Sequence, residues 1–329
     1  MKINKMKLKI LKMLNKEQED FISGADISKR MGVSRTTVSN YIKELRKTGY
    51  VIESRTNQGY NLKKVPDTLI PEEIFLHLET KYMGRNIEYL PQTESTNTTA
   101  KNLAASGVEE GTMVLAEKQS SGRGRRGKEW FSPGGTGLWF SLILRPEFTP
   151  EKVPFLTILT ALSLEKVLRE YRLKPFIKWP NDIYVDNKKV AGILSEISAE
   201  IDFVKYAVVG IGINVNQEFF PEDIKEKATS LKIVSGQNIS RKKLLSDILL
   251  EFENFYELLL ANEEKEILKQ WKNKLDILGH RVQIKTNNRD YYGRAIDISE
   301  GGALILEDES GKQHKFWAGE ASLDWNKND

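Results

Sequence analysis

Glycines and basic residues alternate in one stretch of the chain, residues 119–130, which read Gln-Ser-Ser-Gly-Arg-Gly-Arg-Arg-Gly-Lys-Glu-Trp. Glycines let backbone N–H groups approach a phosphate closely, and arginines neutralise its charge. The side chains show no spacing that could bury a core, and like charges repel one another, so the stretch predicts a loop that is flexible when empty. We expect it to bind an anion and to become ordered on that ligand. The alternative is a solvated basic loop or an RNA contact, although RNA-binding tracts of this kind are usually longer and repeated.

Two further segments place polar side chains beside predicted elements. Ser95, Thr96 and Asn97 precede a helix that we expect to begin near Thr98. A helix cap accounts for one of these side chains but not for all three. Residues 178–182 read Lys-Trp-Pro-Asn-Asp and lead into a hairpin. Both segments are therefore candidates for ligand contacts.

A lysine stands among small and apolar residues on the strand after that hairpin. Alternation predicts that Lys189, Ala191, Ile193 and Ser195 share one face. Such a lysine is unusual on a half-buried strand, and it is a candidate for holding a ligand anion. Taken alone, an exposed hairpin lysine is the simpler interpretation.

Glycines also interrupt a buried strand, because residues 210–216 read Gly-Ile-Gly-Ile-Asn-Val-Asn. A dinucleotide-binding turn does not fit, since the third glycine is missing and no helix follows. Glycine within a buried strand marks the close approach of a ligand or of another backbone. We therefore expect this strand to form the floor of a site.

Hydrophobic periodicity predicts the elements that position these segments. Strands are expected at 112–117, 138–144, 176–179, 183–185, 190–198 and 203–215, and amphipathic helices at 154–171 and within 241–275. Two prolines and a change of charge sign place a domain boundary near residue 65. The chain is thus predicted to be an α+β multidomain protein with a sheet-and-helix domain over residues 66–276.

Residues 1–65 are typical of a helix-turn-helix with a wing. Helices are expected at 6–15 and 25–31, and Gly32 and Ser34 would form the turn and the cap of a further helix. Val38, Ile42 and Leu45 would face inward. The outer helix face and the tip of the following hairpin carry groups suited to phosphates and base edges, namely Arg35, Thr36, Asn40, Lys43, Lys47 and Arg55. A three-helix interaction module that binds no DNA is the alternative.

Composition limits the function further. Residues 1–64 carry 15 Lys and Arg against 6 Asp and Glu, a net charge of +9, whereas the remainder carries 35 against 40, a net charge of −5. The basic first domain suits a polyanion. With no cysteine and 3 histidines, thiolate zinc sites and cysteine nucleophiles are excluded, and a serine–histidine relay is disfavoured. No apolar stretch resembles a membrane span or a signal peptide, so we expect a cytoplasmic protein with no membrane partner.

The last part of the chain predicts a small β domain. Short strands are expected at 281–286, 290–298, 303–307 and 314–318, separated by turns at 287–288, 301–302 and 310–311. This pattern fits an SH3-like barrel over residues 277–329. Residues 317–322 would form its closing strand, and an acidic residue, Asp324, follows it, which does not favour phosphate binding by this domain.

The chemistry-bearing segments, in this order and behind a winged helix, resemble the biotin protein ligases, specifically the bifunctional ligase/repressors. The resemblance covers essentially the whole chain, and its most specific motifs are the Gly-Arg-Gly-Arg-Arg-Gly loop and the Lys-Trp-Pro-Asn-Asp segment. It implies an N-terminal winged helix-turn-helix, a central α/β ligase domain with a mixed, class II synthetase-like sheet, and a C-terminal SH3-like barrel.

Residue roles follow from the resemblance. It implies catalytic roles for Lys189, Arg123, Arg125 and Asp182. Biotin contacts would come from Ser95, Thr96, Asn97, Gln119, Arg123, Gly124, Arg125, Lys189 and Gly192. ATP contacts would come from Arg125, Trp130, Asn181 and Asn214. Residues 217–231 would form a second mobile loop, and Mg²⁺ would arrive with ATP, with Asp182 as its one candidate side-chain ligand.

The implied reaction joins biotin and ATP to give biotinyl-5′-AMP and pyrophosphate, after which a lysine of a biotin carboxyl carrier protein, in acetyl-CoA or pyruvate carboxylase, takes the biotinyl group. The implied partners are this carrier, operator DNA and a second copy of the chain, with dimers formed when biotinyl-AMP and DNA bind. Two alternatives stay open: a ligand-sensing repressor without ligase activity, and a lipoate ligase with the same chemistry.

Overall fold

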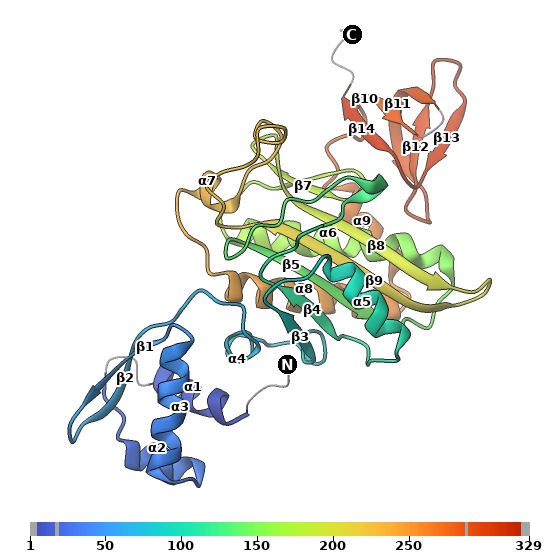
Figure 1. The fold of residues 1–329 in the computed structure, drawn as a ribbon. Helices are drawn as coiled ribbons and strands as arrows, with labels where there is room; N and C mark the ends of the chain where they lie inside the picture. The colour runs from blue at the N-terminus through green and yellow to red at the C-terminus, as the bar shows by residue number, and fades with distance from the viewer. Residues whose placement is uncertain (1–4, 17–19, 287–288, 324–329) are drawn as a thin grey trace. The chain divides into compact units, whose positions relative to one another are not determined.

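The computed structural model describes residues 5–16, 20–286 and 289–323, and the chain divides into two compact units, Met1–Leu78 and Glu79–Asp329 (Figure 1). The two units are divided after Leu78, and the expected domain boundary near residue 65 stays a prediction. Ile70 and Leu76 pack against the helical core of the first unit, and the hydroxyl of Tyr50 donates a hydrogen bond to Glu73. The further division at residue 276 stays a prediction.

The first unit consists of helices followed by a two-stranded wing. Its elements are α1 (Lys5–Lys16), α2 (Gly24–Met31), α3 (Arg35–Lys47), β1 (Val51–Arg55), β2 (Gly59–Lys64) and the short α4 (Pro71–Ile74). The hydroxyl of Ser34 accepts the backbone N–H of Thr37 at 3.0 Å and caps α3. Gly32 takes a φ of +69°, which provides the turn between α2 and α3. The predicted helix-turn-helix with a wing is confirmed.

A mixed seven-stranded sheet forms the centre of the second unit, in the order β3-β4-β5-β9-β8-β7-β6. Its strands are β3 (Ile87–Leu90), β4 (Met113–Ala116), β5 (Gly137–Leu144), β6 (Phe176–Lys178), β7 (Asp182–Val185), β8 (Lys188–Ala199) and β9 (Val204–Asn214). Strands β3 and β4 pair in parallel, and the other neighbours are antiparallel. The expected mixed sheet is confirmed, although the short β3 was missed.

Helices cover both faces of this sheet (Figure 1). On one face lies α5 (Thr96–Ala105), whose Ala100 and Ala104 pack on Val114, Ile143 and Val208. On the other face lie α6 (Val153–Glu170), α8 (Arg241–Leu260) and α9 (Glu264–Lys272). The helix after the Ser-Thr-Asn segment thus begins at Thr96, two residues before the expected start.

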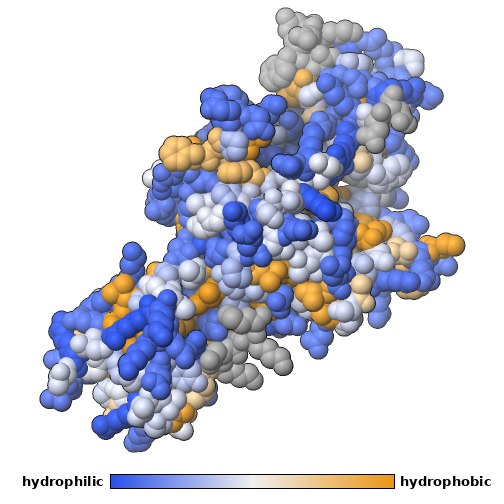
Figure 2. Space-filling view, viewed as in Figure 1, coloured by the Kyte–Doolittle hydropathy of each residue, from blue (hydrophilic) through white to orange (hydrophobic). Residues whose placement is uncertain are grey.

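The long hairpin β8–β9 extends past its neighbours in the sheet. The pairing of β7 with β8 stops at Gly192, and the pairing of β5 with β9 stops at Ala207. Ile201 at the hairpin tip is 91% exposed and Phe203 is 47% exposed. Apolar side chains gather at this tip (Figure 2). On the β7 side, Ile193 of β8 is still bonded to Asn181, but no described strand pairs with β8 beyond that residue, so part of its edge is open.

The last part of the chain that the structure describes, residues 281–286 and 289–323, contains a five-stranded antiparallel sheet in the order β13-β12-β11-β10-β14. These strands are β10 (Arg281–Lys285), β11 (Asp290–Ile298), β12 (Leu304–Glu307), β13 (Gln313–Phe316) and β14 (Glu320–Leu323). Gly302 and Gly311 take positive φ at the two predicted glycine turns. The predicted turn at 287–288 and Asp324 lie outside the described residues. None of the helices described is long and apolar enough to cross a membrane.

Candidate active site

One cavity of about 540 Å³ opens on the α5 face of the central sheet. It is lined by every residue that the sequence analysis assigned to catalysis, biotin or ATP: Ser95, Thr96, Asn97, Gln119, Arg123, Gly124, Arg125, Trp130, Asn181, Asp182, Lys189, Gly192 and Asn214. Segments far apart in the sequence thus meet at one place.

The lining of the cavity is strongly basic. Its positive side chains are Arg123, Arg125, Arg126, Lys128, Lys178, Lys189, Lys227 and Lys285, and its negative ones are Glu129, Asp182 and Glu320. A concave site with this excess of cations raises the local concentration of anions and stabilises them once bound. The cavity is therefore suited to one large anion or to two smaller ones.

Lys189 is one of the basic residues of this lining, and it contacts both Asp182 and Trp130. Its Nζ is 2.7 Å from Oδ1 of Asp182 and 5.0 Å from the ring centroid of Trp130. A β-bulge at Val190 shifts the register between β7 and β8, because Tyr184 pairs with Lys189 whereas Ile183 pairs with Ala191. The expectation that Lys189 shares a face with Ala191, Ile193 and Ser195 is therefore wrong.

The bulge turns the Lys189 side chain to the opposite face. There its Cε lies 3.2 Å from the position that a Cβ of Gly192 would occupy. Ser195 faces the other way, with its hydroxyl 2.9 Å from that of Thr157 on α6. The absence of a side chain at Gly192 thus makes room for the lysine inside the cavity.

The glycine–arginine loop is folded back on itself. The N–H of Gly124 donates to the carbonyl of Lys128 at 2.7 Å, and the N–H of Trp130 donates to the carbonyl of Gly122 at 2.8 Å. Between them, Arg125–Gly127 form a short 3-10 turn. The predicted ordering of this loop on a ligand stays a prediction.

Arg125 points from the loop into the cavity. Its Nη1 donates to Oδ1 of Asn181 at 2.8 Å. Burial lowers the pKa of the guanidinium, and the charge of Asp182 opposes that shift. Arg125 thus joins the loop to the Lys-Trp-Pro-Asn-Asp segment.

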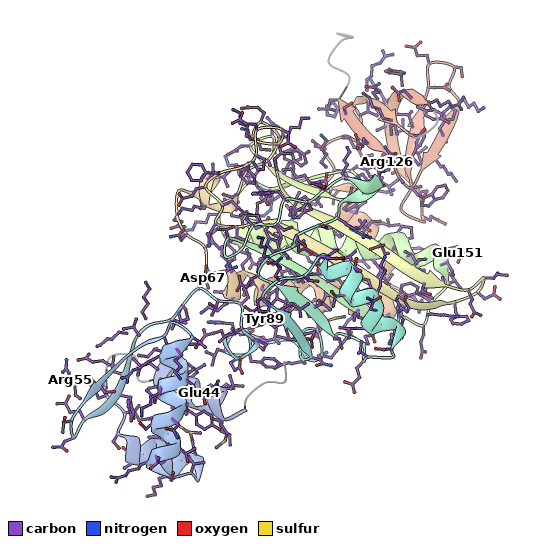
Figure 3. All side chains as sticks on the ribbon, viewed as in Figure 1. Glu44, Arg55, Asp67, Tyr89, Arg126 and Glu151 are labelled. Atoms are coloured by element: carbon purple, nitrogen blue, oxygen red, sulfur yellow. The ribbon has the colours of Figure 1, made fainter. Side chains whose placement is uncertain are left out.

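The outer side of the loop contacts the C-terminal sheet. Lys128 forms an ion pair with Glu320. Arg126, which Figure 3 labels on this loop, donates to the carbonyl of Lys285 at 3.3 Å. The hydrogen bond from Lys128 is the main reason that the pKa of Glu320 is lowered. Sequence analysis missed both C-terminal residues, because contacts between remote segments leave no local pattern.

The glycines of β9 accommodate side chains. A Cβ on Gly212 would lie 2.4 Å from Nε1 of Trp130, and a Cβ on Gly210 would lie 2.0 Å from Oδ1 of Asn97. The strand does form the floor of the cavity, as expected. The groups that lie against its glycines are side chains of the protein, whereas we expected a ligand or another backbone. Trp130 and Asn97 are seated directly on the sheet.

A polar network lies at the α5 end of the cavity. The N–H of Thr96 donates to Oε1 of Gln119 at 2.8 Å, and the hydroxyl of Ser141 lies 2.7 Å from Oδ1 of Asn97. Nδ2 of Asn97 donates to Glu196 at 2.8 Å. The Asn97 amide is thus engaged within the protein, and its ligand contact stays a prediction. Ser141 and Glu196 went unnoticed in the sequence because each lies inside an apolar strand pattern.

Burial and hydrogen bonding act in opposite directions on Glu196. Burial by itself raises the pKa of its carboxyl group, but hydrogen bonds from Lys101 and Asn97 outweigh burial and hold the pKa below its ordinary value. On the far side of the cavity, burial and the charge of Asp182 raise the pKa of Tyr184 to about 12. Glu196 is therefore held as a carboxylate and Tyr184 as a neutral phenol at neutral pH.

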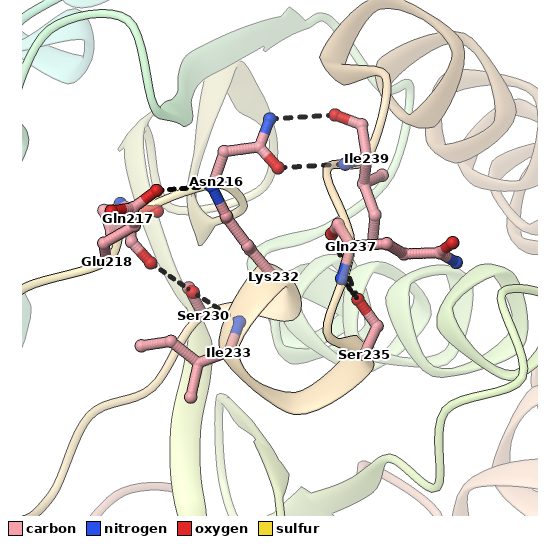
Figure 4. Close-up of polar contacts among 9 residues, drawn as sticks. All are labelled: Asn216, Gln217, Glu218, Ser230, Lys232, Ile233, Ser235, Gln237 and Ile239. Carbon is pink, nitrogen blue, oxygen red and sulfur yellow. Dashed lines mark hydrogen bonds and ion pairs between the residues drawn. The ribbon is translucent and has the colours of Figure 1, made fainter.

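The second loop is closed at its base by hydrogen bonds (Figure 4). The hydroxyl of Ser230 donates to the carbonyl of Gln217 at 2.6 Å. The side-chain amide of Asn216 donates to the carbonyl of Ile239 and accepts from its N–H, each at 2.9 Å. Ser230 also caps the short α7 (Leu231–Ser235) through the N–H of Ile233. The ends of the loop are thus fixed independently of any ligand.

Three family models match the chain. The Biotin/lipoate A/B protein ligase family matches residues 89–214, an HTH domain matches residues 7–61, and the Biotin protein ligase C terminal domain matches residues 277–324. The bifunctional ligase/repressor BirA of Bacillus subtilis is 40% identical over 92% of this chain and 94% of its own. The chain belongs to the biotin protein ligase family.

Further relatives agree with this assignment. The bifunctional ligase/repressor BirA of Escherichia coli is 29% identical over 98% of both chains. The biotin protein ligase from Aquifex aeolicus, solved in complex with biotin and ATP, is 32% identical with a TM-score of 0.63, and covers 73% of this chain and 99% of its own. The resemblance identified from the motifs is confirmed. In this chain the HTH match precedes the ligase match along the sequence.

The first unit of this ligase presents the residues expected to contact DNA. Arg35, Thr36, Asn40, Lys43 and Lys47 are all exposed on α3. Arg55 on the wing (Figure 3) also contacts the protein: its Nε is 2.8 Å from Glu53, and its guanidinium lies 4.6 Å from the ring centroid of Phe21. Arg55 is nevertheless exposed, like the α3 residues, so both parts of this surface are open to a ligand.

Among the residues described, no group of three or more His, Asp or Glu side chains is placed so that it could hold a metal ion. Asp182 lines the cavity, but Lys189 occupies its Oδ1. Asp182 is thus the assigned side chain that could contribute an oxygen ligand, and the arrival of Mg²⁺ with ATP stays a prediction.

Proposed function

We propose that this chain is an ATP-dependent biotin protein ligase that also represses transcription in response to biotinyl-AMP. The observation that carries the proposal is the basic cavity in which Lys189, Arg125, Asp182 and Trp130 meet. Two anions, a carboxylate and a triphosphate, must be held together for this reaction. The excess of positive charge in the lining matches that requirement.

The chemistry requires positioning and charge neutralisation and no protein nucleophile. A carboxylate oxygen of biotin attacks the α-phosphorus of ATP, the bond to the β-phosphate oxygen breaks, and pyrophosphate leaves. Lys189, Arg123 and Arg125 would neutralise the negative charge that gathers on the oxygens. The amine of the acceptor lysine then attacks the biotinyl carbonyl, and AMP leaves with the electron pair.

Each end of the cavity suits one substrate. We assign biotin to the end formed by Ser95, Thr96 and Gln119, and the nucleotide to the end formed by Trp130 and Asn181. Mg²⁺ would arrive on the phosphates and neutralise part of their charge, with Asp182 as the side chain able to contribute a ligand. The folded loop would keep water from the mixed anhydride.

A transfer assay tests the enzymatic part. The full chain is incubated with ATP, Mg²⁺, a carboxyl-carrier domain and labelled biotin or labelled lipoate. Biotin label on the carrier lysine is expected. Lipoate label in its place would make the chain a lipoate ligase, and transfer of neither would leave a ligand-sensing repressor.

We further propose that two copies pair when biotinyl-AMP is bound and present two winged helices to a palindromic operator. The open edge of β8 and the apolar hairpin tip at Ile201 suit a second copy, since unpaired strand edges favour association. Sedimentation with and without biotinyl-AMP tests this. Ile201→Asp should remain monomeric while retaining ligase activity, and unchanged dimers would overturn the assignment of the surface.

The remaining partners and the location follow from the same chemistry. The acceptor is proposed to be a biotin carboxyl carrier protein of acetyl-CoA or pyruvate carboxylase, which would compete with the second copy for the same side of the ligase. The lack of cysteine is consistent with a reducing cytoplasm. Mass spectrometry of biotinylated proteins from cells that express the chain would identify the acceptor.

A further inference from the structure

The second loop is bonded to the backbone of Lys189. The N–H of Lys189 donates to the carbonyl of Lys227 at 2.8 Å, and the N–H of Thr229 donates to the carbonyl of Lys189 at 3.0 Å. The two segments form a parallel bridge, Lys189 with Ala228. The loop therefore contacts the proposed catalytic lysine itself as well as the cavity.

This bridge occupies a place that the sheet leaves open. The pairing of β8 with β9 begins only at Ala191, which faces Ile213. Lys189, two residues earlier in the sequence, therefore has no partner on β9. On its other side, Lys189 pairs with Tyr184 next to the bulge. Residues 227–229 thus supply the hydrogen bonds that β9 would have supplied in a regular sheet, at the point where the lysine is turned into the cavity.

Asn214 fixes both ends of this loop. Its Oδ1 accepts from Nε2 of Gln217 at 3.2 Å, and its Nδ2 donates to the carbonyl of Thr229 at 3.0 Å. All three side chains are buried, with at most 4% of each exposed. Movement of the loop is therefore transmitted through Thr229 to Lys189.

We infer that residues 227–229 of the second loop are a positioning element for Lys189, with Thr229 acting through its backbone N–H. The loop then does more than cover the intermediate, because it sets where the ammonium group stands beside Asp182 and Trp130. This inference rests on the proposed role of Lys189 toward the biotin carboxylate. It predicts that loosening the loop weakens biotin binding even before any nucleotide is present.

Thr229→Pro tests the inference, because proline removes the N–H that donates to Lys189. Thr229→Val is the matched control, since it retains the N–H and the size of the side chain. Biotin affinity of the full chain is measured calorimetrically without ATP. We expect about tenfold weaker binding in Thr229→Pro, as for loss of one buried hydrogen bond, and little change in Thr229→Val.

A double-mutant cycle with Lys189→Ala separates positioning from general damage. If the loop acts through Lys189, adding Thr229→Pro to Lys189→Ala weakens biotin binding no further. Additive losses, or unchanged biotin affinity in Thr229→Pro together with faster escape of biotinyl-AMP, would overturn the inference and leave the loop as a cover alone.

Two controls make the outcome unambiguous. Ser230→Ala breaks the link to Gln217 at the loop base without placing a proline in the chain, and it should weaken biotin binding in the same direction. It decides the question if Thr229→Pro does not fold. Failure of the wild-type chain and Thr229→Val to transfer biotin would refute the proposed function, an outcome distinct from failure of this inference.

Discussion

Nη1 of Arg125 lies 2.8 Å from Oδ1 of Asn181, and this hydrogen bond connects two motifs that are 56 residues apart in the sequence. It spans the cavity between the glycine–arginine loop and the segment before β7. The loop is thereby held over the place proposed for the mixed anhydride. Loss of this contact should affect retention of the intermediate more than its formation.

Arg125→Ala is accordingly expected to release biotinyl-AMP faster, by about tenfold or more, since a charge-assisted hydrogen bond contributes about 1.5–3 kcal/mol. Free biotinyl-AMP acylates lysines of bystander proteins, which a blot for biotin detects. Arg125→Lys retains the charge but loses the planar fork, so it should give an intermediate result. An off-rate equal to that of the wild type would contradict the role of the loop as a cover.

Lys189→Ala should abolish adenylate formation and leave the fold intact. The lysine provides the positive charge nearest to Asp182 and Trp130, and no other group of the strand replaces it. Pyrophosphate release and a thermal melt of the same sample measure the two properties. Full activity in the variant would mean that the site is misplaced.

The two glycines of β9 should separate the ends of the cavity. In Gly212→Ala the new Cβ would lie 2.4 Å from Nε1 of Trp130, so the indole must move, and the KM for ATP should rise about tenfold. In Gly210→Ala the collision is with Asn97, and weaker biotin binding is expected. Calorimetric titrations with each substrate distinguish the variants, and identical profiles would argue against two distinct ends.

Substitutions on α3 should weaken DNA binding without affecting ligation. Lys43→Ala removes one exposed cation, so the slope of log affinity against log salt should fall by about one unit. Lys12→Ala, an exposed position on α1, is the matched control. Equal slopes for the two variants would place the DNA surface elsewhere. Biotin transfer is expected to be the same in both.

Glu196 should stabilise the fold in a pH-dependent way. Because its pKa in the folded chain is lowered from the ordinary 4.5, its contribution is fully present above that value and is lost as the pH falls through the lowered one. Glu196→Gln should therefore melt at a lower temperature than the wild type at pH 7. The difference should shrink as the pH falls below 4.5, and a difference that stays constant as the pH falls would exclude the ionised carboxylate as its cause.

Local pattern was sufficient to predict most elements. Alternation located β5 and β9, helical periodicity located α6, and the Ser34 cap with Gly32 located the turn of the helix-turn-helix. The four-residue β3 escaped because its sequence, Ile-Glu-Tyr-Leu, is too short to show a period. The division of the two units after Leu78 also escaped, since it depends on Ile70 and Leu76 packing on a core formed by earlier residues.

The residues that line the cavity could be named from the sequence, but their geometry could not. Motif residues converge because each follows or precedes a strand of one sheet. The bulge at Val190 was not predictable, because it depends on the register between β7 and β8, and it alone decides which face carries Lys189. The seating of Trp130 on Gly212 likewise depends on how a loop folds over a strand distant in sequence.

The ion pair between Lys128 and Glu320 is solvent-exposed, with 66% and 51% of the two side chains accessible. Attraction between charges in that setting is screened by dissolved salt over about 8–10 Å at physiological ionic strength. The contact between the C-terminal sheet and the glycine–arginine loop therefore weakens as the salt concentration rises. The ionic strength of the cell would then influence how long biotinyl-AMP is retained by the protein. It would thereby influence whether biotinyl-AMP is used for transfer to the carrier or for repression.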